Sequence, residues 1–77
     1  MEMQTYETSD IALAAFLYCS GAHLSGIDHH NPRRCIFAFD SPKPELISRW
    51  QEGNANVNAL AFHNAYQELK ARLFRRA

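Results

Sequence analysis

The chain has 77 residues, and we expect one small hydrophobic core and one domain covering residues 1–77. With 47% hydrophobic and 21% charged residues it does not resemble a disordered chain, which holds fewer apolar residues and more net charge. The net charge is zero, yet residues 1–30 carry four acidic residues and no Lys or Arg, while all eight basic residues lie at or after Arg33. This asymmetry indicates either a polarised surface or charges matched to helix ends.

The hydropathy pattern excludes a membrane-spanning segment. The best apolar run, residues 11–19, is about half the length that crosses a bilayer. No basic region precedes an apolar stretch near the N-terminus, so we expect no signal peptide. Two cysteines are too few for a disulfide framework. We therefore expect a cytoplasmic protein with no membrane partner.

The first part of the chain predicts a strand followed by a helix. Residues 4–7 are typical of a short strand. Residues 8–10 supply N-cap oxygens, which accept hydrogen bonds from the free backbone N–H groups of a helix start. The predicted helix continues to about Ser20 and is apolar on most sides, which indicates that it is buried. Gly21 then suits the position that ends the helix.

Two strands joined by a turn come next. Residues 22–30 predict a strand in which a bulge at Ser25 and Gly26 brings both Leu24 and Ile27 to the core. Residues 31–34 predict a turn around a proline. Residues 35–39 predict the central strand, because both of its faces are apolar.

The last part predicts two helices. Pro44 favours a helix start, and a helix over residues 44–52 is expected to end at Gly53. Asn58 is expected to cap a final helix that reaches Phe74, with apolar residues at a 3.6-residue period. Its residues 68 and 72 form a correctly oriented i,i+4 ion pair.

These elements predict an α+β fold of the order β-α-β-β-α-α. A right-handed crossover would make the first two strands parallel, and the third strand, antiparallel to both, is expected between them. We therefore expect a three-stranded mixed sheet of order 1-3-2, with the helices packed mainly on one face.

A set of cap, turn and core positions spread over nearly the whole chain carries a resemblance to a known family. These positions are residues 6–10, 14–17, Gly21, residues 24–27, 36–40, Gly53, Val57 and residues 62–70. The chain resembles a family of small uncharacterised phage and bacterial proteins of similar length, a domain of unknown function. The resemblance implies a fold and a mobile-element origin, and it brings no catalytic residue. Residues 29–32 depart from the family pattern.

The sequence contains no established catalytic or metal-binding motif, and we expect no enzyme activity, cofactor or metal. No C-x-x-C, H-E-x-x-H or phosphate-binding glycine loop occurs. If the turn has four residues, His30 lies opposite Cys35, a pair that suits a nucleophile with its base or two metal ligands. An exposed turn histidine beside a buried cysteine is the simpler interpretation.

Two surfaces remain as candidates for binding. Helices on one face leave the other face of the sheet uncovered, and an uncovered apolar face invites a protein partner or a second copy. Clustered basic residues offer a nucleic-acid contact instead. We expect a non-enzymatic protein-interaction module; the alternative is a nucleic-acid-binding accessory protein, and the third interpretation is the Cys/His site. The uncovered face comprises Met3, Thr5, Ile36 and Ala38. The basic residues form one group at the predicted turn, Arg33 and Arg34, and another at the end of the last helix, Lys70, Arg72, Arg75 and Arg76.

Overall fold

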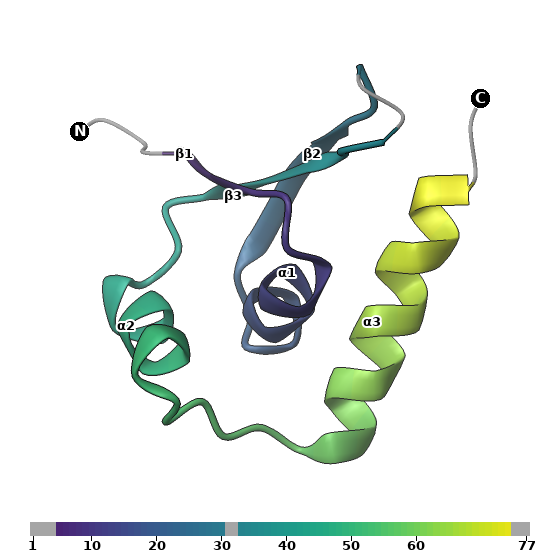
Figure 1. The fold of residues 1–77 in the computed structure, drawn as a ribbon. Helices are drawn as coiled ribbons and strands as arrows, with labels where there is room; N and C mark the ends of the chain where they lie inside the picture. The colour runs from purple at the N-terminus through teal and green to yellow at the C-terminus, as the bar shows by residue number, and fades with distance from the viewer. Residues whose placement is uncertain (1–4, 31–32, 75–77) are drawn as a thin grey trace.

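The computed structural model describes residues 5–30 and 33–74, and within them the chain forms three strands and three helices (Figure 1). The order is the predicted β-α-β-β-α-α, and each element lies within one or two residues of its expected place. The elements are β1 (Thr5–Thr8), α1 (Ile11–Cys19), β2 (His23–Asp28), β3 (Ile36–Asp40), α2 (Pro44–Glu52) and α3 (Ala59–Phe74).

The sheet has the predicted strand order β1-β3-β2, with β3 in the centre. Both pairs are antiparallel: Tyr6 and Leu24 each pair with Phe39, from opposite sides. The expected description as a mixed sheet is therefore wrong. β1 and β2 do run in the same direction, but β3 separates them, so every hydrogen-bonded pair is antiparallel.

The predicted bulge in β2 is present. Leu24 pairs with Phe39 and Gly26 pairs with Ala38, which leaves Ser25 as the extra residue. The Ser25 hydroxyl donates a hydrogen bond of 3.0 Å to the carbonyl oxygen of Ala38 and so binds the bulge to the central strand. As a result Leu24 and Ile27, three residues apart, both pack against the core.

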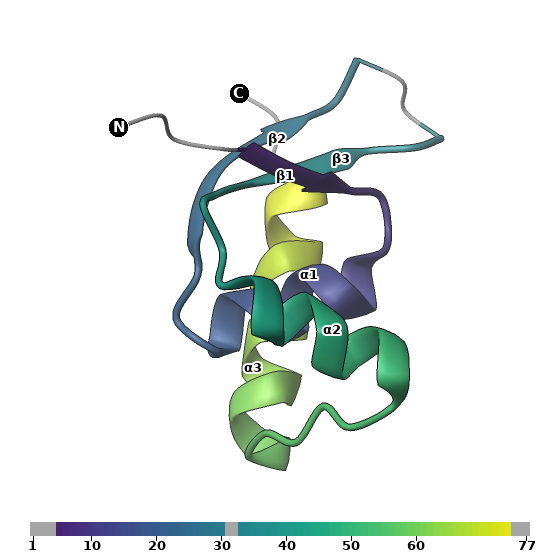
Figure 2. The same ribbon diagram turned by 90° about the vertical axis from the view of Figure 1, so that its left-hand side faces the viewer.

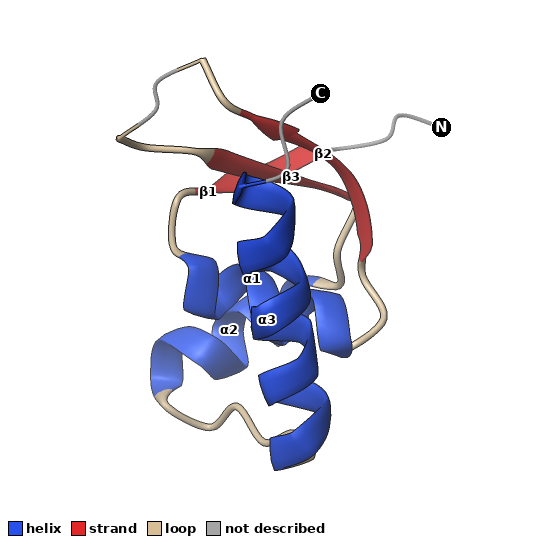
Figure 3. Ribbon diagram, turned by 90° about the vertical axis from the view of Figure 1, so that its right-hand side faces the viewer, coloured by secondary structure: helices blue, strands red, loops and turns tan. Residues whose placement is uncertain are grey.

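All three helices lie on one side of the sheet (Figures 2 and 3). α1 is in the middle, with α2 and α3 on either side of it (Figure 1). Because α1 is enclosed by the sheet and its two neighbours, five consecutive residues of α1 are buried, which explains its apolar character all round. The buried core consists of Leu13, Ala14, Ala15, Phe16, Leu17, Phe37, Phe39, Ala65 and Leu69.

The predicted helix boundaries carry the expected caps. The Asp10 carboxylate accepts hydrogen bonds from the first-turn N–H groups of Ala12 and Leu13, at 3.0 and 3.4 Å. Gly53 ends α2 in the left-handed conformation, with φ at 79°, which glycine adopts without strain. Asn58 accepts from the N–H of Ala61 at 2.9 Å at the start of α3.

Trp50 on α2 and Tyr66 on α3 pack against the core. Trp50 lies with its ring centroid 5.5 Å from that of Phe16, on the buried helix α1. Tyr66 is half-buried and packs against the same core from α3. Their helical spacing from Ile47 and Phe62, which also pack against the core, agrees with this placement.

Candidate functional site

The face of the sheet opposite the helices carries the first candidate surface (Figure 2). Phe37 and Phe39 are buried towards the helices, so the alternating residues Ile36 and Ala38 lie on the other face, where both are half-buried. Thr5 is exposed on the edge strand β1 and pairs with Asp40. Three of the four residues predicted for this surface are thus placed, and Met3 lies outside the described residues.

The strand register adds acidic residues to this face, which were not among the predicted site residues. Glu7 pairs with Ala38 from one side, and Asp28 pairs with Ile36 from the other. Cross-strand partners on one face lie close enough to interact. The uncovered face therefore has a narrow apolar centre on β3 with a carboxylate on each neighbouring strand. No sequence pattern predicted that Glu7 and Asp28 lie beside the apolar residues of β3, because the pairing register of the three strands decides which residues are neighbours.

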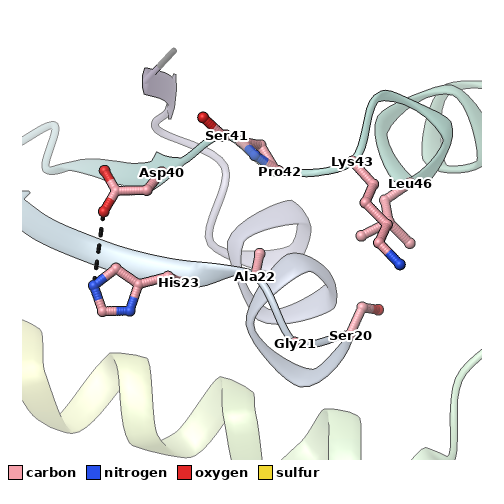
Figure 4. A pocket seen from close by; sticks show the side chains of 9 residues that line it. All are labelled: Ser20, Gly21, Ala22, His23, Asp40, Ser41, Pro42, Lys43 and Leu46. Atoms are coloured by element: carbon pink, nitrogen blue, oxygen red, sulfur yellow. Dashed lines mark ion pairs between the residues drawn. The ribbon is translucent and has the colours of Figure 1, made fainter. Parts of the chain in front are cut away.

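A shallow pocket of about 240 Å³ lies where the end of β3, the start of β2 and the start of α2 meet (Figure 4). His23 and Asp40 face each other across its edge, with 3.7 Å between Nε2 and Oδ2. The His23 side chain is 76% exposed, so water screens this pair and it adds little stability. Lys43 and Leu46 border the pocket from the side of α2.

The residue types around this pocket include those of a Ser-His-Asp triad, but their arrangement does not form one. The hydroxyls of Ser20 and Ser41 are both well separated from the His23 imidazole in Figure 4. A triad needs the nucleophile within hydrogen-bond reach of the imidazole. The pocket therefore shows an exposed His–Asp contact and no assembled nucleophile.

A cysteine–histidine contact is present at the end of the β2–β3 hairpin. The Cys35 Sγ lies 3.7 Å from the Nδ1 atom of His29, and both residues are half-buried. His30 was the predicted partner of Cys35, and this prediction is wrong by one residue. Asp28 and Ile36 form the last pair of the ladder, and His29 and Cys35 are the residues immediately beyond it on the two strands. The connection is thus one residue longer than the predicted four-residue turn.

Cys19 has a different environment from Cys35. Its Sγ donates a hydrogen bond of 3.4 Å to the carbonyl oxygen of Phe16 inside α1. Burial raises the pKa of the Cys19 thiol above its ordinary value, because the thiolate would lose hydration. Cys19 is thus a packed thiol, and the two cysteines are not joined in a disulfide.

The described residues of the two predicted basic groups lie at the hairpin tip and on α3. Arg33 and Arg34 are exposed at the hairpin tip, whereas Lys70 and Arg72 lie on α3. Arg72 forms the predicted ion pair with Glu68, at 3.0 Å between Nε and Oε2, and also donates to the Tyr18 hydroxyl oxygen at 3.4 Å. Its charge is therefore partly compensated. Arg75 and Arg76 lie outside the described residues.

Within residues 5–30 and 33–74, no group of three or more His, Cys, Asp or Glu side chains is arranged to hold a metal ion. In the same part of the chain, no helix combines the length and apolar character needed to cross a bilayer.

The comparisons with known proteins identify a family. Residues 3–75 match the model of a domain of unknown function, DUF5659. No curated protein and no solved structure gives a significant match. Because the matched region spans nearly all of the 77 residues, the chain belongs to the DUF5659 family.

Proposed function

We propose that this protein is a non-enzymatic interaction module that acts through protein–protein contacts, with the uncovered face of the sheet as its contact surface and a second copy as its partner. The observation that carries this proposal is the one-sided packing of the helices, which leaves no helix of the described residues over the face that carries Ile36 and Ala38. A sheet with one apolar strip and two open edges is a ready contact surface.

The chemistry of this face predicts how two copies would interact. Contact between two such faces would bury the apolar centre formed by Ile36 and Ala38, which favours association. It would also bring the carboxylates of Glu7 and Asp28 on one copy close to those on the other, which opposes it. We therefore expect a weak dimer that becomes stronger as salt screens the acidic side chains.

Replacing Ile36 with glutamate is expected to weaken self-association by about tenfold or more, because the burial of a side chain of this size contributes roughly 1.5–3 kcal/mol. Glutamate is the sharper choice than lysine, since lysine would be attracted to Glu7 and Asp28 on the partner face. Sedimentation equilibrium of the full chain at low and high salt measures the effect.

The matched control is Leu60→Glu, which makes the same kind of change at a side chain that is 67% exposed on α3. This variant should associate like the wild type. A wild-type chain that stays monomeric up to roughly 1 mM would contradict the proposal, because a contact of about 4 kcal/mol is half formed at that concentration. Equal dimerisation of the Ile36→Glu variant would contradict it as well.

The hairpin tip supports a second candidate function, binding to nucleic acid. Arg33 and Arg34 are both exposed there, and the hairpin extends beyond the helices (Figure 2). In fluorescence anisotropy with DNA, replacing both arginines with alanine should weaken binding. The double variant should also flatten the salt dependence, by roughly 0.9 in the log–log slope for each phosphate that is no longer neutralised. Arg49→Ala, at an exposed arginine on α2, is the control; binding without salt dependence would exclude this function.

A further inference from the structure

The contact between Cys35 and His29 has the atom separation expected for two ligands of one zinc ion. A zinc ion binds a thiolate sulfur at about 2.3 Å and an imidazole nitrogen at about 2.0–2.1 Å, with tetrahedral angles. Two such ligand atoms are then separated by roughly 3.6 Å. The observed distance between Sγ of Cys35 and Nδ1 of His29 is 3.7 Å. The two atoms are therefore already separated by the distance that a shared zinc ion requires.

The position of this pair suits a ligand that arrives from outside the chain. The two residues lie one position beyond Asp28 and Ile36, the last antiparallel pair of β2 and β3, and their side chains meet at the hairpin end. Both are half-buried, so each side chain is supported by its surroundings and still reachable. Cys35 does not belong to the buried core, in contrast to Phe37 two residues later.

We propose that Cys35 and His29 form half of a zinc site, and that the same pair from a second copy completes it. Structural zinc sites use four ligands, and two cysteines with two histidines are one of the common sets. Residues 5–30 and 33–74 offer no third ligand to this pair. A two-fold axis through the metal supplies the two missing ligands and predicts one ion for two chains.

This zinc site is distinct from the uncovered face of the sheet. Ile36 lies on that face at the start of β3, whereas Cys35 lies one residue before β3 and, by continuation of the alternation, on the side of Phe37. The proposal therefore does not rest on the self-association proposed above, and the Ile36→Glu variant separates the two. In that variant the sheet-face contact is removed and the zinc ligands are kept.

The test is zinc titration of the reduced, untagged full chain, in the wild type and in the Ile36→Glu variant, followed by sedimentation velocity. Zinc is expected to convert both proteins to dimers at one ion per two chains, and a chelator should return the Ile36→Glu variant to monomers. Cobalt should give a thiolate-to-metal charge-transfer band. Acidification should dissociate the zinc-induced dimer, since protons compete with the metal for both ligands.

Cys35→Ser and His29→Ala should each abolish the zinc-induced dimer. Cys35→Ser should also abolish the charge-transfer band of the cobalt-loaded protein. Cys19→Ser and His30→Ala are the matched controls and should respond to zinc like the wild type. Circular dichroism checks that each variant is folded. A chain that stays monomeric in zinc, that binds one ion per chain without dimerising, or that responds equally after Cys35→Ser would overturn the proposal. A dimer that resists the chelator and yields only to a reductant would indicate a disulfide and would overturn it too.

Discussion

Replacing Phe39 with alanine is expected to lower the free energy of unfolding by about 3–5 kcal/mol. Phe39 is fully buried in the central strand, between Tyr6 and Leu24 on the neighbouring strands, on the side of the sheet that the helices cover. Removal of the Phe39 ring would leave a cavity, which the close-packed neighbouring side chains would fill only in part. A domain of this size has roughly 4–12 kcal/mol of stability in total, so much of it would be lost.

Urea unfolding followed by circular dichroism measures this change. Phe39→Leu keeps most of the buried volume and should lose less stability than Phe39→Ala. Leu60→Ala removes an apolar side chain that is 67% exposed, and its effect should stay within about 0.5 kcal/mol. If Phe39→Ala lost less than about 1 kcal/mol, the placement of β3 at the centre of the core would be wrong.

The parts of the fold that the sequence predicted well depend on short-range chemistry. An N-cap such as Asp10 or Asn58 acts on N–H groups two or three residues away, so its effect is contained in the local sequence. Gly53 likewise ends a helix through its own backbone conformation. The strand order was also predictable, because a short hairpin and a crossover leave few arrangements for three strands.

The candidate sites were less predictable because they depend on register. The turn after β2 was expected to have four residues, and one additional residue moves the partner of Cys35 from His30 to His29. A shift of one residue also exchanges the faces of a strand, so such an error changes which side chains meet. The acidic residues beside Ile36 and Ala38 were missed for the same reason, since they come from different strands.

Replacing Leu69 with alanine is expected to lower the free energy of unfolding by about 2–5 kcal/mol and the melting temperature by roughly 10 °C or more. Leu69 is fully buried on α3, and α3 packs mainly against α1, at one side of the molecule (Figure 1). Because this helix has one main partner, truncating its central buried side chain should also speed amide hydrogen exchange in α3 more than in β3. Lys70→Ala, at the exposed neighbouring residue, is the control and should leave both quantities nearly unchanged. Equal exchange in α3 before and after the change would show that Leu69 does not hold this helix on the domain.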